Sequence, residues 1–129
     1  MFYSLVAVAG GGAIGAVFRF LTVILSSKCF GTKFPYGTIL VNSSGSFLAG
    51  VLMVLIISRF SHNDIPRLFL MVGFLGGFTT FSSFSWETWA LYEAGETLKA
   101  CLNVLLNNLS ALSLALLGIN VGRWLGGHF

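Results

Sequence analysis

The sequence predicts an all-α integral membrane protein with four transmembrane helices in a single domain, residues 1–129. Of its 129 residues, 56% are hydrophobic and only 9% are charged. One small core could not bury that much apolar surface in water, which argues against a soluble domain. Four apolar stretches are each long enough to cross the hydrocarbon layer, which takes about 20 residues in a helix.

The predicted spans follow one another in the order Phe2–Ser27, Tyr36–Ser58, Leu68–Trp86 and Ala100–Gly122. The first span holds a single charge, Arg19, and the second and fourth hold none. The third continues as a wetter helix past Glu87 and Glu93. The first stretch has no preceding basic region and is long enough to span, so we expect a helix there rather than a secretory signal.

The connections are short and polar, with Pro66 suited to a position just ahead of the third helix. An even number of spans puts both termini on one side. The Lys and Arg residues then balance, three on each side: Arg59, Arg67 and Arg123 against Lys28, Lys33 and Lys99. Because Lys and Arg bias sets orientation, balance favours dual topology, with inverted copies pairing as an antiparallel homodimer. Misplaced span ends are the alternative.

Small residues four apart predict close helix contacts, because they let backbones approach. The pairs are Gly11 and Gly15, Gly73 and Gly77, and Gly118 and Gly122. Gly10, Gly12 and Gly15 also satisfy G-x-G-x-x-G, but no βαβ unit surrounds them, so a nucleotide site is not expected. No catalytic triad, phosphate loop or metal-ligand cluster is visible. We expect neither an enzyme nor a nucleic-acid partner.

The run from Gly76 to Ser85 is unusual inside a span, with two glycines, five hydroxyls and phenylalanines at positions 78, 81 and 84. Backbone that leaves the helix at membrane depth is tolerated only where protein buries it or it lines a cavity. The run therefore predicts a third helix broken at mid-membrane, and a site beside the break. Carbonyl oxygens around Gly76 and Thr79 would lose their helical partners. A small hard cation or ordered water could satisfy them.

Two stripes of polar side chains lie on single helical faces of the second and fourth spans: Thr38, Asn42 and Ser46, and Asn103, Asn107 and Ser110. Polar groups in hydrocarbon usually face a bundle interior or an aqueous path. The stripes therefore predict either a pathway or hydrogen bonding between helices.

The charge inventory favours an anion as the transported species. No carboxylate is expected deep in a span, Arg19 is the one ionisable group there, and His62 and His128 lie outside the spans. The candidate groups are hydrogen-bond donors: Arg19, Thr38, Asn42, Thr80, Ser83, Asn103, Asn107 and Ser110. Arg19 could instead snorkel to the interface or pair with Glu87.

Phe81 and Phe84 are spaced to lie on one helical face beside these donors. An aromatic ring has a positive edge, so a ring turned edge-on can approach an anion. Core packing is the alternative interpretation.

The sequence resembles the Fluc (CrcB) family of fluoride channels over nearly its whole length. The resemblance rests on Gly12-x-x-Gly15-x-x-x-Arg19, on the run from Tyr36 to Asn42, and on the run from Gly73 to Glu87. The last run is highly specific.

The resemblance implies a passive, fluoride-selective channel that rejects chloride and protects a microbe from accumulated fluoride. It implies an antiparallel dual-topology homodimer in the inner (plasma) membrane, with two pores that each draw on both subunits. Asn42, Phe81 and Phe84 would line the pore, Arg19 would lie near its mouth, and Glu87 would lie in a vestibule. Backbone carbonyls of Gly76 and Thr79, two from each subunit, would hold a structural sodium ion on the dimer axis.

The fourth span departs from the family pattern, with Asn103 and Asn107 in its polar track and Ala111 where a serine often stands. Ser110 is the expected substitute. Two other functions compete with a channel. A small multidrug-type secondary transporter shares the topology but needs an intramembrane carboxylate, and a non-conducting structural protein would carry no flux.

Overall fold

The computed structural model describes residues 1–59 and 64–127, and its described residues contain helices and no strand. The helices in chain order are α1 (Phe2–Phe30), α2 (Tyr36–Arg59), α3 (Ile65–Arg67), η1 (Leu68–Leu75), α4 (Gly76–Phe78), α5 (Phe81–Glu93) and α6 (Thr97–Gly126). The segment η1 is a π-helix, a wider turn that is rare and frequently found at functional sites.

The predicted four spans are confirmed: residues 1–59 and 64–127 contain four helical stretches long and apolar enough to cross a membrane. Their lengths are 29, 24, 29 and 30 residues, the third being the series from α3 to α5. Most of their ends lie beyond the predicted ones. For example, α1 continues past Ser27 to Phe30. Hydropathy marks where a helix is apolar, whereas its hydrogen bonds continue through polar residues at the ends.

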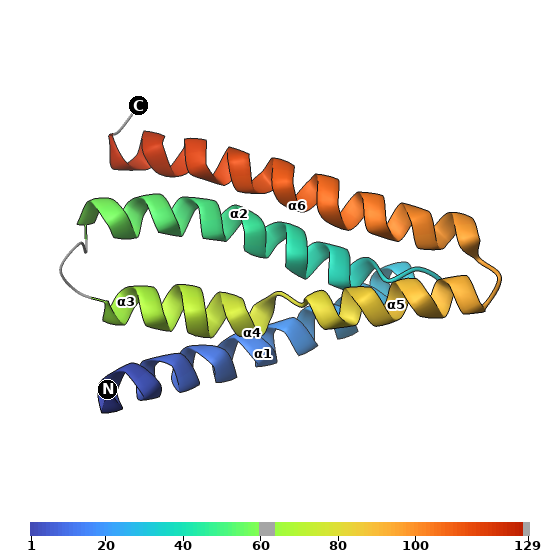
Figure 1. Cartoon of the computed structure of the whole chain (residues 1–129), viewed down its shortest axis with the longest axis horizontal. Coiled ribbons are helices and arrows are strands. Elements are labelled where there is room, and N and C mark those ends of the chain that lie inside the picture. Colours follow the sequence, from blue (N-terminus) through green and yellow to red (C-terminus); the bar gives the residue numbers. More distant parts are fainter. Residues whose placement is uncertain (60–63, 128–129) are drawn as a thin grey trace.

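The four stretches run alternately up and down, so the start of α1 and the end of α6 lie at the same end of the bundle as the end of α2 and the start of α3 (Figure 1). Arg59, Arg67 and Arg123 therefore belong to that end. Lys28, Lys33 and Lys99 belong to the opposite end, beside the turns after α1 and α5. The single chain thus has the equal charge distribution that the sequence suggested.

Glycines bring the helices together in two pairs, α1 against η1 and α4, and α2 against α6. A Cβ on Gly73 would lie 2.8 Å from the Val8 carbonyl oxygen, and one on Gly77 would lie 2.6 Å from that of Gly12. On the other pair, a Cβ on Gly118 would collide with the Phe47 carbonyl group. The predicted close helix contacts are confirmed at these positions.

Replacing Gly11 with alanine is expected to destabilise the folded chain by about 2 kcal/mol, because the core there has no room for a methyl group. The new Cβ would lie 2.9 Å from the Phe74 backbone nitrogen and would collide with the Phe69 carbonyl oxygen. The neighbouring change Gly10→Ala is the control, since its Cβ would meet only the Phe69 ring at 3.6 Å. Thermal unfolding in detergent compares the two, and equal melting temperatures would contradict the packing argument.

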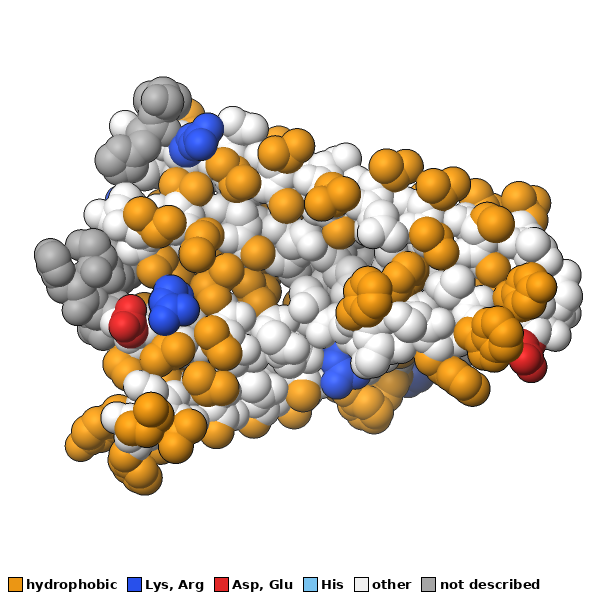
Figure 2. Space-filling view, viewed as in Figure 1, with side chains coloured by type: hydrophobic (Ala, Val, Ile, Leu, Met, Phe, Trp, Pro, Cys, Tyr) orange, Lys and Arg blue, Asp and Glu red, His pale blue; other side chains and the backbone are white. Residues whose placement is uncertain are grey.

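The outer surface of the single chain is apolar along its length. Large hydrophobic side chains such as Phe20, Leu105 and Leu116 are 62%, 54% and 64% exposed. Figure 2 shows hydrophobic side chains along the visible face from one end of the bundle to the other, among other side chains and backbone, with acidic side chains only toward the two ends. Such a surface suits contact with lipid or with another apolar helix surface.

Candidate ion pathway

The third helical stretch leaves the helical conformation at Thr79 and Thr80. Their backbone angles are φ −84°, ψ 156° and φ −150°, ψ 117°, both extended. Helix α5 then begins at Phe81, with Thr80 as its N-cap. The Thr80 hydroxyl accepts a hydrogen bond from the Ser83 backbone N–H at 3.1 Å, which satisfies one of the free donors at a helix start.

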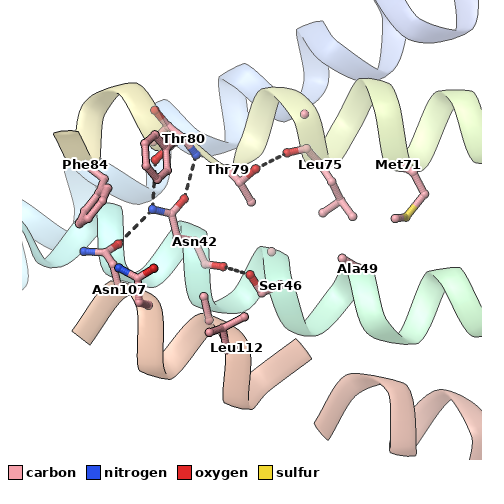
Figure 3. Close-up of a pocket in the computed structure, with 15 residues that line it drawn as sticks. Asn42, Ser46, Ala49, Met71, Leu75, Thr79, Thr80, Phe84, Asn107 and Leu112 are labelled. Atoms are coloured by element: carbon pink, nitrogen blue, oxygen red, sulfur yellow. Dashed lines mark hydrogen bonds between the residues drawn. The ribbon is translucent and has the colours of Figure 1, made fainter. Parts of the chain in front are cut away.

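Asn42 of α2 binds the extended residue Thr80 at two points (Figure 3). The Thr80 backbone N–H donates to Asn42 Oδ1 at 2.8 Å, and Asn42 Nδ2 donates to the Thr80 carbonyl oxygen at 3.1 Å. A buried backbone N–H or C=O must find a partner when helix bonding stops. The Asn42 amide supplies both partners and so stabilises the interruption.

The same interruption releases backbone carbonyl groups. In a continuous helix the Thr80 N–H would donate to the Gly76 carbonyl and the Ser83 N–H to that of Thr79. The first donor is instead bonded to Asn42 and the second to the Thr80 hydroxyl. The carbonyls of Gly76 and Thr79 thereby lack their usual helical donors.

Arg19 of α1 lies against this region. Its Nε donates to the Gly77 carbonyl oxygen at 2.9 Å. The predicted alternative, a pair with Glu87, does not form. The ion pairs among residues 1–59 and 64–127 are Arg67 with Asp64 and Lys99 with Glu96. Arg19 therefore supplies the Gly77 carbonyl, next to the interruption, with a donor from another helix.

A first cavity of about 440 Å³ opens beside the interruption. It is lined by residues of α2, of the third stretch and of α6: Asn42, Gly45, Ser46, Ala49, Met71, Leu75, Gly76, Thr79, Thr80, Phe81, Phe84, Asn107, Asn108, Ala111 and Leu112. The sequence-predicted residues Asn42, Thr80, Phe81, Phe84 and Asn107 meet here, and so do Gly76 and Thr79. Figure 3 shows Asn42, Thr80 and Asn107 converging at one end of this cavity.

Phe81 and Phe84 meet edge to face at this cavity, with ring centroids 5.3 Å apart and planes at 62°. Their surroundings differ. Phe84 is buried, at 8% exposure, whereas Phe81 is 75% exposed. An aromatic ring so exposed in a single chain is available for contact with a second molecule or with an ion.

The asparagines of α6 continue the polar contacts away from the cavity. Asn42 Nδ2 donates to Asn107 Oδ1 at 3.0 Å, and Asn107 Nδ2 donates to Asn103 Oδ1 at 3.0 Å. Asn103 Nδ2 in turn donates to the Thr88 hydroxyl at 2.9 Å. Asn103 is fully buried and Asn107 is 5% exposed, so these amides lie between helices and not in open space.

The other predicted hydroxyl residues lie outside the first cavity, except Ser46. Ser110 lies between α6 and α2, where its hydroxyl is 2.7 Å from that of Ser43, and it also donates to the Leu106 carbonyl. Ser46 lines the first cavity but donates to the Asn42 carbonyl at 2.6 Å. Ser83 contributes its backbone N–H to the cap at Thr80, and neither it nor Ser110 lines the first cavity.

Thr38 and Glu87 line a second cavity of about 340 Å³, near the turn between α1 and α2. Thr38 is buried, at 2% exposure. Glu87 Oε1 is buried without a hydrogen-bond partner among the described residues. The sequence placed Glu87 in a wetter continuation of the third span, whereas the structure encloses one of its oxygens against α2.

Three polar residues in or near these contacts were not predicted as site residues: Ser43, Thr88 and Asn108. Ser43 and Thr88 are recognised only through partners on other helices, which a single sequence does not reveal. Asn108 faces the cavity next to Asn107 and donates to its own helix at Val104. His62 and His128 lie outside the described residues.

The chain is similar to known proteins over almost its full length. Residues 6–119 match the sequence model of the family described as CrcB-like protein, Camphor Resistance (CrcB). The chain belongs to the CrcB family.

Curated CrcB-family relatives carry the name fluoride-specific ion channel FluC. The relative from Legionella pneumophila (strain Paris) is 48% identical over 123 residues, which cover 95% of this chain and 92% of the relative. The relative from Shewanella sp. (strain ANA-3) is 49% identical over 124 residues, covering 95% and 94%. The relative from Hydrogenovibrio crunogenus is 45% identical over 119 residues, covering 92% and 90%.

Proposed function

We propose that this chain is a fluoride-selective channel that exports fluoride passively and lowers its toxic accumulation in the cytoplasm. The proposal rests chiefly on the similarity to CrcB-family proteins named fluoride-specific ion channels. Their sequences are 45% to 49% identical to this chain over almost its full length. The first cavity supports it, because amide groups and two phenylalanine rings lie together beside an interrupted helix. These relatives are channels, so we propose a transport protein and not an enzyme.

The working form is an antiparallel, dual-topology homodimer in the inner membrane of a microbe, with two pores that each draw on both subunits. The even distribution of Lys and Arg between the two ends supports dual topology. The exposure of Phe81 on the apolar surface supports a second copy at the first cavity. The interrupted helix then lies at mid-membrane, where protein covers it on both sides.

A sodium ion on the dimer axis is part of the proposal. Gly76 and Thr79 line the first cavity, and their carbonyl oxygens lack the usual helical donors. Carbonyl oxygens are the ligands that small hard cations prefer. A Cβ on Gly76 would meet nothing within 4 Å in the single chain, so this part of the backbone is open to a partner subunit.

Removing sodium during purification is expected to shift the protein from dimer to monomer or aggregate, because the carbonyls would then face one another without a cation. The measurement is size-exclusion chromatography in sodium-free buffer containing N-methylglucamine, compared with sodium buffer of equal ionic strength. A dimer population and melting temperature that do not depend on sodium would contradict the proposed ion.

Fluoride flux from reconstituted liposomes tests the function. Vesicles loaded with potassium fluoride should release fluoride when valinomycin lets potassium follow, and vesicles loaded with potassium chloride should release far less. A fluoride flux no higher than that of liposomes without protein would contradict the channel proposal and favour a structural protein. Proton-driven uptake of organic cations would instead revive the secondary-transporter alternative.

A further inference from the structure

A continuous series of side-chain hydrogen bonds connects the interrupted helix to a point on α5 outside the first cavity. It begins at the Thr80 backbone N–H and passes through Asn42, Asn107 and Asn103 to the Thr88 hydroxyl. The Thr88 hydroxyl then donates to the Phe84 carbonyl at 2.8 Å. We call the side chains of Asn42, Asn107, Asn103 and Thr88 the amide relay.

The direction of every bond in the amide relay is fixed from both of its ends. The Thr88 hydroxyl donates its hydrogen to the Phe84 carbonyl and can therefore only accept from Asn103 Nδ2. A backbone N–H can only donate, so the Thr80 N–H fixes Asn42 Oδ1 toward itself and Nδ2 away. Asn42 Nδ2 then requires an acceptor on Asn107, and Asn107 Nδ2 requires one on Asn103. Reversing any amide would place two donors or two acceptors face to face.

The amide hydrogens at the cavity end of the relay are already used. Asn42 Nδ2 donates to both the Thr80 carbonyl and Asn107 Oδ1. Asn107 Nδ2 donates to both the carbonyl and Oδ1 of Asn103. Asn103 is fully buried and does not line the first cavity. An ion in this cavity therefore has no direct access to Asn103.

We propose that Thr88, Asn103 and Asn107 are positioning residues that hold the Asn42 amide in the orientation needed to bind Thr80. Asn103 and Asn107 of α6 thereby act on permeation through the orientation of the Asn42 amide. The inference rests on the proposed function, because permeation is the activity that the orientation of Asn42 serves. It gives a role to the two asparagines by which the fourth span departs from the family pattern.

Thr88 allows the sharpest test, because it lies at the far end of the relay and does not line the first cavity. Thr88→Val keeps the side-chain shape but removes the acceptor for Asn103 Nδ2, leaving a buried donor unpaired. The orientations of Asn103, Asn107 and Asn42 are then no longer fixed from this end. Fluoride flux is expected to fall by about tenfold. Thr88→Ser restores the hydroxyl and should restore the flux.

Thr22→Val is the matched control. The Thr22 hydroxyl on α1 donates to the carbonyl four residues earlier, at Phe18, as the Thr88 hydroxyl does to Phe84, with 2.8 Å in both cases. Thr22 is not part of the relay, so this change removes the bond to its own helix alone. Its flux should equal that of the unaltered protein.

A second readout is the side-chain amide resonance of Asn42 in nitrogen-15 NMR spectra of the dimer in detergent. It should shift in Thr88→Val and not in Thr22→Val or Thr88→Ser. Full flux with an unmoved resonance in Thr88→Val would overturn the relay. Equal losses in Thr88→Val and Thr88→Ser would also overturn it, because they would show a packing effect. If the unaltered protein carries no fluoride, the proposed function fails while the resonance still decides the relay.

Discussion

Replacing Asn42 with alanine is expected to lower fluoride flux by about 100-fold while the dimer remains assembled. The change removes the bonds from Asn42 to the Thr80 N–H, to the Thr80 carbonyl and to Asn107. A buried polar group left without its partner costs about 1–3 kcal/mol, and each 1.4 kcal/mol corresponds to a tenfold change in rate. The extended backbone at Thr80 then loses the contact that fixes it beside the first cavity.

Asn42→Asp tests whether the effect comes from the lost side-chain volume or from the lost hydrogen-bond donors, because aspartate keeps the size of asparagine but lacks its N–H groups. An aspartate can accept from the Thr80 N–H, but its second oxygen would face the Thr80 carbonyl and Asn107 Oδ1, both acceptors. Its flux should be as low as that of the alanine variant. Ser44→Ala is the control on the same helix, because Ser44 is exposed and donates to its own helix at Leu40.

Fluoride efflux from liposomes measures these variants, and size-exclusion chromatography checks that each dimer is intact. Flux in Asn42→Asp equal to that of the unaltered protein would show that the donors of Asn42 are not needed. A dimer lost only in the two Asn42 variants would show that Asn42 serves assembly and not permeation.

The four helical stretches could be predicted from the sequence because apolar length alone requires them. A run of about 20 apolar residues has few stable arrangements other than a membrane helix. The close contacts at Gly73 and Gly118 were predictable for a related reason, since small residues four apart lie on one face and allow backbones to approach.

The surroundings of the polar stripe of α6 could not be predicted from one sequence. Asn103, Asn107 and Ser110 share a helical face, as predicted, but that face packs against α2 and α5. The first cavity meets α6 at one residue of this stripe, Asn107, and otherwise at Asn108, Ala111 and Leu112, which lie further around the helix. Helical periodicity identifies a polar face but does not say whether it contacts another helix or a cavity, because that depends on tertiary packing.

The contacts of Asn42 could not be predicted for the same reason. Its place on α2 and its polar character were evident, but its bonds to Thr80 join residues 38 positions apart. Such a pairing depends on how α2 crosses the interrupted stretch. The bond from Arg19 to the Gly77 carbonyl joins residues 58 positions apart and was missed likewise. The sequence showed which residues were unusual, and packing determined what each of them binds.

Phe81→Leu is expected to lower fluoride flux by about tenfold while each chain keeps its fold. Leucine keeps an apolar side chain but removes the ring whose positive edge can approach an anion, an effect worth about 1 kcal/mol in aromatic pairs. Phe81 is 75% exposed and Phe84 is 8% exposed. Phe84→Leu should therefore lower the melting temperature as well as the flux, because it also disturbs packing. Phe81 is the cleaner position at which to test the ring itself.

The control for Phe81→Leu is Phe20→Leu on α1, since Phe20 is 62% exposed and lies outside both cavities. Its flux and melting temperature should match those of the unaltered protein. Fluoride and chloride efflux from the same liposome preparations measure conduction and selectivity together. If Phe81→Leu conducts fluoride at the unaltered rate, the ring is not part of the pathway and the exposed side chain serves only contact between subunits. If flux falls while the dimer and its melting temperature are retained, the loss is in permeation, which is where a ring edge at the first cavity would act.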